Sequence, residues 1–217
     1  GALIAEWKRP AAWLTGGALH AAAGVATAVV AIELMPRAIA SAEMWLLAIG
    51  FLAGAGASIL LVRATEWARR HFVEPGKALG SWAVYGAVSA DLLVDGLTTG
   101  AGAAVSTGLG LLLALSQVVA NIPGGFAVTA HLRRTSAERA QRLRMAALYP
   151  VTPVLGGAAG YLLLSGASDQ VMGIALASFS GLLLLATVED IVPQADEPGA
   201  PRRISSPAFA FGFVALM

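Results

Sequence analysis

Two aspartates lie one helical turn apart in the middle of a strongly apolar stretch. Asp91 and Asp95 have the i, i+4 spacing that puts both carboxylates on the same face of a helix. A central aspartate costs roughly 2.5–3.5 kcal/mol to insert into a membrane, and none of the complete spans predicted below contains a Lys or Arg to neutralise it. Either a cation binds between the carboxylates, or protonated carboxyls hydrogen-bond to neighbouring helices. Because ionisable residues inside membranes are usually functional, the pair predicts a cation site.

A segment that interrupts a second apolar stretch offers further oxygen ligands. In Asn121-Ile122-Pro123-Gly124-Gly125, the proline removes a helical hydrogen bond and frees the carbonyl one turn earlier. That carbonyl and the Asn121 amide can line a cavity, and Gln117 falls on the same helical face. Thr152, flanked by prolines, is another candidate oxygen ligand. The alternative is a packing kink whose glycines let two helices approach closely.

Acidic residues also stand at the ends of two other apolar stretches. Glu33 ends one of them, and Glu189 and Asp190 end another. They are candidates to line the two approaches to a central cation site. The alternative is that they are ordinary interfacial acids at helix ends.

The composition indicates where these residues must be placed. The 217-residue chain is 57% hydrophobic and only 12% charged, and its mean hydropathy is +0.74. Soluble domains carry about 25% charged residues, so a soluble enzyme, a disordered chain and a nucleic-acid binder that relies on bulk charge are excluded. The composition predicts an all-α integral membrane protein in a lipid bilayer, with no nucleic-acid partner. The chain has no cysteine, which excludes disulfides and thiolate metal sites.

Six apolar stretches are long enough to cross roughly 30 Å of hydrocarbon as helices. They are Ala11–Met35, Met44–Val62, Leu79–Thr99, Ala103–Ala130, Met145–Leu164 and Gln170–Val188. The shorter segments Gly1–Ala5 and Pro207–Met217 are predicted to be parts of a first and an eighth span. The whole chain, residues 1–217, is therefore predicted to be one transmembrane domain.

The placement of basic residues predicts the orientation of these spans. With eight spans, every Lys and Arg except Arg37 falls in a connection on the same side of the membrane. The positive-inside rule makes that side cytoplasmic. We therefore expect a multi-pass protein of the cytoplasmic (inner) membrane with both termini outside.

Two segments that leave the membrane on opposite sides resemble each other. Ile32–Ala38 and Glu189–Ala195 each contain an acid three residues before a proline, followed by a polar residue and an alanine. Val94–Leu97 and Pro123–Phe126 form a second pair in the central spans. The order is three spans, a central pair and three spans. Inverted repeats around interrupted central helices are characteristic of transporters.

These segments together resemble the ZIP family of divalent-metal transporters over nearly the whole chain. Glu33–Ala38 is similar to the HLLPEA that ends the family's second span, and Asp91–Gly96 falls where the fourth span carries HNxPEG. The remaining matches are Ile49–Gly54 in the third span, Ala120–Gly125 at the fifth-span HExPEG, Pro150–Gly156 at the sixth-span AEPLG and Val188–Ala195 at the end of the seventh. The resemblance implies an eight-helix 3+2+3 bundle with inverted repeats and both termini outside.

The metal-ligand positions of that family are altered here. Asp91, Leu92 and Asp95 replace His, Asn and Glu in the fourth span. Ala120, Asn121 and Gly124 occupy the fifth-span positions, and Thr152 replaces the sixth-span glutamate. The resemblance therefore implies one reduced site of Asp91, Asp95 and Asn121, with Gln117 or Thr152. Hard oxygen donors suit Mg²⁺, Mn²⁺ or Ca²⁺ better than Zn²⁺, although the pattern does not choose among these ions or Fe²⁺.

The leading hypothesis is a carrier, not an enzyme, that moves a divalent cation across the membrane. The cation would be the substrate, with no permanently bound cofactor, and no nucleotide-binding motif indicates a use of ATP. Two alternatives stay open: a non-transporting scaffold or partner subunit that has lost its ligands, and a proton-coupled carrier of another solute. The small-residue run Gly50–Gly56 permits close helix packing, a homodimer or a larger membrane complex.

Overall fold

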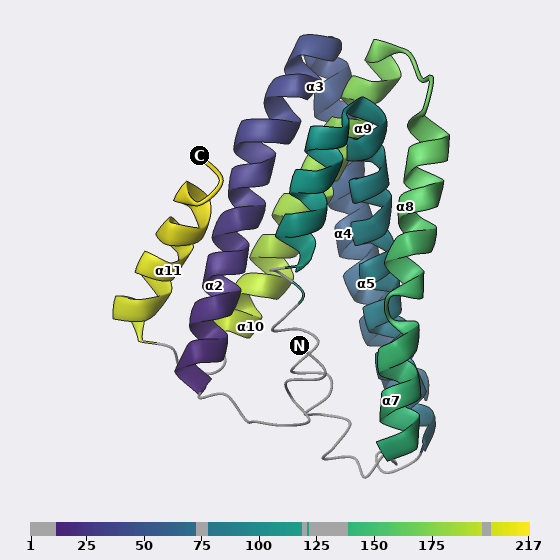
Figure 1. Ribbon diagram of the computed structural model, residues 1–217, viewed down its shortest axis with the longest axis vertical. Helices are drawn as coiled ribbons and strands as arrows, with labels where there is room; N and C mark the ends of the chain where they lie inside the picture. The colour runs from purple at the N-terminus through teal and green to yellow at the C-terminus, as the bar shows by residue number, and fades with distance from the viewer. Residues whose placement is uncertain (1–11, 73–77, 119–120, 122–138, 197–200) are drawn as a thin grey trace.

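The computed structural model describes residues 12–72, 78–118, 121, 139–196 and 201–217, and the regular elements in this part of the chain are all helical (Figure 1). The first elements are α2 (Ala12–Ala28), the π-helical turn η1 (Val29–Leu34), α3 (Met35–Ser41), α4 (Met44–Phe72) and α5 (Ala78–Val105). A helix at Thr107–Val118 follows. The later elements are α7 (Arg139–Leu148), α8 (Val151–Leu164), α9 (Asp169–Ala186), the π-helical turn η2 (Thr187–Ile191), α10 (Val192–Asp196) and α11 (Arg202–Val214).

Four helical stretches within the described residues are long and apolar enough to cross a membrane. They are Gly16–Ser41, Met44–Ala64, Leu143–Leu164 and Asp169–Glu189, and Leu92–Val105 and Thr107–Val118 are shorter apolar helices. Their outward faces are apolar: Leu52 on α4 and Leu162 on α8 are 69% and 74% exposed. Such faces require a hydrocarbon solvent, so the chain is an all-α multi-pass membrane protein, as its composition predicted. The predicted first-span segment Gly1–Ala5 lies outside the described residues.

Two helical rods continue through a proline that the sequence analysis had placed beyond the end of a span. The first rod, α2–η1–α3, passes Pro36, and the second, α9–η2–α10, passes Pro193. Just before each proline the helix widens to π-type bonds, from the Met35 amide to the Val30 carbonyl and from the Val192 amide to the Thr187 carbonyl. A proline ring clashes with the carbonyl four residues earlier in an α-helix, and the wider turn relieves that clash.

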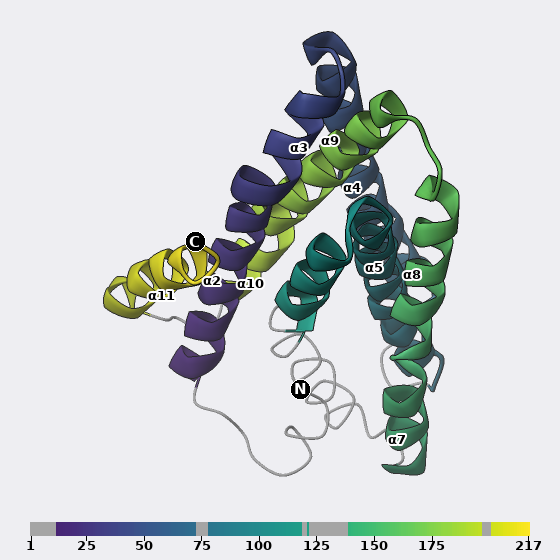
Figure 2. The same ribbon diagram turned by 45° about the horizontal axis from the view of Figure 1, so that its top comes forward.

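The two rods run in opposite directions, as the views in Figures 1 and 2 agree, and each packs on a partner helix in the same way. A Cβ added at Gly24 would collide with the backbone of Phe209 on α11, and one added at the equivalent Gly181 would collide with Phe51 on α4. The partner helices also use equivalent glycines, Gly212 against α2 and Gly54 against α9. This matched packing is what an inverted repeat produces, although the complete eight-helix arrangement remains a prediction. Within the predicted small-residue run, Gly50 and Gly54 therefore serve packing inside the chain.

A second close contact joins α5 to α8, which lie side by side in both views (Figures 1 and 2). Gly96 and Gly100 of α5 face the backbones of Pro153 and Gly157, and Gly156 and Gly160 of α8 face the backbone of α5 in return. Larger side chains at these positions would separate the helices. The glycines thus keep the α8 segment that contains Thr152 close to the α5 segment that contains Asp95.

The connection between the fourth and fifth spans is very short. The α5 helix continues to Val105, beyond the predicted end at Thr99, and the next helix begins at Thr107 rather than at Ala103. Ser106 separates them, and its hydroxyl accepts a hydrogen bond from the Leu109 amide at 3.2 Å. Serine is a favoured N-cap because its side chain satisfies an amide that the first turn leaves unpaired. This cap returns the chain directly alongside α5.

The sixth and eighth spans also begin differently from the predicted stretches. The sixth is divided at Tyr149 and Pro150, where α7 ends and α8 begins, because proline suits the start of a helix better than its interior. The last helix begins at Arg202 and continues through Pro207. Arg202 and Arg203 therefore lie in its first turn rather than in a connection.

Candidate metal centre

The backbone of α5 is helical without interruption from Ala78 to Val105, and it contains both central aspartates. The i, i+4 spacing of Asp91 and Asp95 therefore becomes one helical turn, about 6 Å of rise along one face. The Asp95 side chain is half-buried. The side chain of Asp91 lies outside the described residues.

Asp95 is joined to the fifth span by a hydrogen bond between side chains. The Asn121 Nδ2 donates to Asp95 Oδ2 at 2.7 Å. An ionised carboxylate only accepts, so the amide presents its NH₂ group to Asp95 and its carbonyl oxygen is directed elsewhere. A hydrogen bond to a charged acceptor is stronger than one between neutral groups. The structure thus brings together two of the residues that the sequence analysis grouped.

The other two oxygen candidates are not shown in contact with this pair. Gln117 is half-buried on the helix Thr107–Val118 and makes no hydrogen bond with the residues that the structure describes. The Thr152 hydroxyl donates to the Tyr149 carbonyl at 2.9 Å, within the turn before α8. Its oxygen keeps a lone pair for another partner. Gln117 and Thr152 therefore remain predicted ligands.

The acids at the ends of the rods have different surroundings. Glu33, in η1, is paired with Arg37 one turn later: Glu33 Oε2 accepts from Arg37 Nε at 3.3 Å and from Nη2 at 2.9 Å. Glu189, in η2, is exposed. The side chain of Asp190, which is equivalent to Glu33 in the repeat, lies outside the described residues. Glu33 is therefore not an isolated anion, which the sequence analysis did not anticipate.

Few charged side chains near Asp95 lie within the described residues. Within the described residues, no group of three or more His, Cys, Asp or Glu side chains could hold a metal ion. A cation at Asp95 would need its remaining ligands from amide, hydroxyl and backbone oxygens and from Asp91. That donor set, poor in nitrogen and without sulfur, suits hard divalent ions.

A second contact between elements involves His20 of α2 and Asp196 of α10. The His20 Nδ1 is 2.9 Å from the Gly16 carbonyl oxygen, and its Nε2 is 3.3 Å from Oδ1 of Asp196 on α10.

The i, i+4 spacing of Glu33 and Arg37 could have revealed their ion pair from the sequence alone. The distance between His20 and Asp196 along the chain gave no comparable signal.

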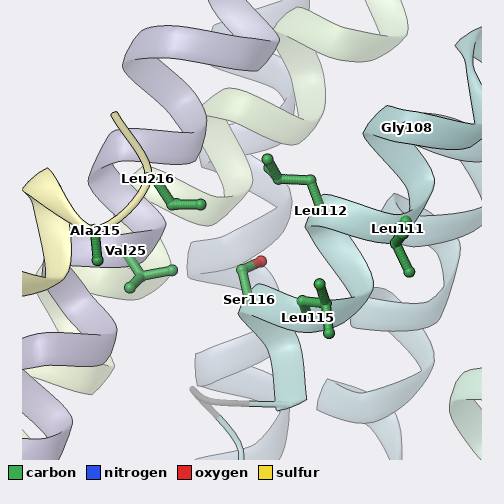
Figure 3. Close-up of a pocket in the computed structure, with 8 residues that line it drawn as sticks. All are labelled: Val25, Gly108, Leu111, Leu112, Leu115, Ser116, Ala215 and Leu216. Carbon is green, nitrogen blue, oxygen red and sulfur yellow. The ribbon is translucent and has the colours of Figure 1, made fainter.

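A pocket of about 430 Å³ lies between α2, the helix Thr107–Val118 and the chain end after α11 (Figure 3). Its lining is aliphatic apart from Ser116, whose hydroxyl donates to the Leu113 carbonyl at 2.8 Å. The other lining residues are Val25, Gly108, Leu111, Leu112, Leu115, Ala215 and Leu216. Without a charged group or a set of oxygen ligands, this pocket cannot hold a cation, so the candidate centre stays at Asp95.

The comparison with known protein families matches a stretch of the chain that includes these central helices. The family model described as ZIP zinc transporter matches residues 69–216, which include Asp91, Asp95, Asn121 and Thr152. The match covers more than half of the chain and begins near the end of α4. None of the curated proteins compared with the chain matches it.

Proposed function

Because this chain belongs to the ZIP zinc transporter family, whose members are metal transporters and not enzymes, we propose that it carries a divalent cation through a site that Asp95 and Asn121 share. The observation that supports this site most directly is the 2.7 Å hydrogen bond from the Asn121 amide to the Asp95 carboxylate. It joins the two central spans at the residues where the family resemblance implies metal ligands.

The pair is suited to alternate between an empty and a loaded state. Without a cation, the Asn121 NH₂ group compensates part of the Asp95 charge. When a cation arrives, the carboxylate oxygens turn to it and the amide rotates to present its carbonyl oxygen. The amide is therefore a donor in one state and a ligand in the other. Asp91, one turn away on the same helix, would supply the second negative charge.

The proposed substrate is a hard divalent cation such as Mg²⁺, Mn²⁺ or Ca²⁺. Two carboxylates balance a charge of +2, whereas the histidine nitrogens that favour zinc are missing from the family positions. Gln117 and Thr152 would complete the oxygen shell. Glu33 and the Glu189–Asp190 pair would line the two approaches, and access would alternate as one group of helices moves against the other. The positive-inside rule supports the cytoplasmic membrane and outward termini.

The proposal is tested by uptake of Mn²⁺, Mg²⁺ and Ca²⁺ into proteoliposomes that contain the full chain and no ATP. Asp95→Asn keeps the side-chain shape and removes the charge, so uptake should fall at least about tenfold, as expected when an ion loses a charged ligand. The matched control is Asp169→Asn, because Asp169 is exposed in the first turn of α9, and it should transport normally. Unchanged uptake by Asp95→Asn combined with Asp91→Asn would rule out this site. A wild-type chain without metal flux would favour the scaffold alternative.

A further inference from the structure

His20 connects the beginning of the first rod to the end of the second. As a whole residue, His20 is 8% exposed, and it lies on α2, against which α10 packs. The imidazole spans the contact: Nδ1 lies 2.9 Å from the Gly16 carbonyl oxygen of its own helix, and Nε2 lies 3.3 Å from Oδ1 of Asp196. Both ring nitrogens therefore have a defined partner.

The chemistry of these partners determines how many protons the contact needs. A backbone carbonyl can only accept a hydrogen bond, so Nδ1 must carry a proton. In a neutral imidazole Nε2 then has only a lone pair, and this lone pair would face the lone pairs of a carboxylate. The contact attracts only when one further proton is present, either on Nε2 or on the Asp196 carboxyl. The pair is thus built to hold one proton.

The two ends of the pair differ in their access to solvent. The His20 side chain is 11% exposed, whereas that of Asp196 is 67% exposed, so a proton can arrive by way of the carboxylate. The elements packed on α2 and α10 carry other charged groups: Glu189 and Asp190 on η2, Glu33 on η1, Asp169 on α9, and Arg202 and Arg203 on α11. Among the side chains that the structure describes, Glu33 pairs with Arg37, and the charged group that pairs with His20 is Asp196.

The opposite end of the molecule lacks this connection. In the inverted repeat, the residue equivalent to His20 is Ala177, and the residue equivalent to Asp196 is Ile39. Both are apolar, so α3 packs on α9 without a titratable bridge, whereas α10 packs on α2 with one. The pair is therefore a difference between two halves that otherwise pack alike.

We propose that His20 and Asp196 form a proton-binding site that holds α10 against α2 and releases it when the proton leaves. Because the contact between Nε2 and Oδ1 attracts only while that proton is present, the attachment of α10 weakens when a rise in pH removes it. Because α10 directly follows η2 and Glu189, its release would loosen one of the two approaches to the cation site. This last consequence rests on the proposed function, whereas the proton-dependent attachment does not.

The absence of cysteine from the chain allows a direct test with single introduced thiols. Ala195 on α10 and its repeat equivalent Ala38 on α3 are both fully buried at 0% exposure, which makes Ala38→Cys the matched control for Ala195→Cys. The ratio of their maleimide-labelling rates cancels the intrinsic effect of pH on a thiol. From pH 5.5 to 8.5 this ratio should rise about fivefold, a size typical of losing one intramolecular hydrogen bond. A constant ratio would overturn the proposal.

Two second-site variants separate the proton site from a general loosening of the fold. His20→Gln and Asp196→Asn, each combined with the two cysteine reporters, should make the labelling ratio independent of pH. Asp196→Asn changes an exposed side chain, so it should fold even if His20→Gln does not. A pH-dependent ratio that survives Asp196→Asn would refute the assignment. Labelling requires no transport, so wild-type protein without metal flux would count against the proposed function and leave this test intact.

Discussion

One carboxylate oxygen of Glu33 accepts hydrogen bonds from both Nε and Nη2 of Arg37. The two side chains are partly exposed, at 26% for Glu33 and 41% for Arg37, and they lie where the first rod passes from η1 to α3. An acid that was expected to attract a cation is therefore already beside a positive charge. A divalent ion at this approach would have to compete with the guanidinium.

Removal of the Arg37 guanidinium should speed cation uptake from the side of the membrane on which Glu33 lies. In Arg37→Gln, Glu33 becomes an unpaired anion, and the initial uptake rate at low cation concentration should rise about two- to fivefold, with a larger effect at low ionic strength. The stability should change by less than about 1 kcal/mol, because partly exposed ion pairs contribute little. Initial rates in proteoliposomes at two salt concentrations measure the effect. Arg202→Gln, at an exposed position on α11, is the control, and equal rates for the two variants would remove Glu33 from the pathway.

The hydrogen bond between Asn121 and Asp95 makes a prediction about affinity. Asn121→Asp replaces the amide donor by another acid, so divalent-cation affinity should increase on the order of tenfold, as expected when a site gains a charged ligand. Asn121→Ala should lower the affinity, because a ligand and the partner of Asp95 are both lost. Titration calorimetry with Mn²⁺ in detergent measures the two changes. Gln170→Glu, at an exposed position on α9, adds the same charge away from the site, and an identical gain there would show that the effect is nonspecific.

The matched glycines predict matched losses of stability. Gly54→Ala and Gly212→Ala each place a methyl group against a backbone of the opposite repeat, and each should destabilise the protein by roughly 1–3 kcal/mol, the usual range for overpacking. Gly56→Ala is the control, since a Cβ there meets nothing within 4 Å. It should be neutral or slightly stabilising, because alanine is the better helix former. Thermal unfolding in detergent provides the comparison. Loss at Gly54 but not at Gly212 would contradict equivalent packing of the two repeats.

The composition and the family motifs were enough to predict the fold class. The apolar stretches and the pattern shared by Ile32–Ala38 and Glu189–Ala195 led to an all-α membrane protein of the ZIP family, and both conclusions are confirmed. These features are visible in sequence because a bilayer demands long apolar helices and a repeat leaves similar residues at similar spacing. The composition of the cation site stays a prediction.

The contacts of individual polar side chains were harder to predict. Pro36 and Pro193 suggested helix ends, yet a local π-turn lets each rod continue, a choice that depends on packing around the proline. His20 and Asp196 are far apart in sequence and meet only because the second rod returns antiparallel to the first. The Asn121–Asp95 hydrogen bond also depends on how two spans pack. Spacing within one helix is readable from sequence, whereas the partner on another helix is set by the tertiary fold.

The wide turns before Pro36 and Pro193 have a mechanical consequence for the two rods. A proline cannot donate a hydrogen bond to the carbonyl of the preceding turn, so each rod is most pliable near its own C-terminal end. Because the rods are antiparallel, their pliable ends lie at opposite ends of the bundle. A bend at one of these prolines therefore leaves the other rod straight beside it, and the two ends of the bundle can bend independently.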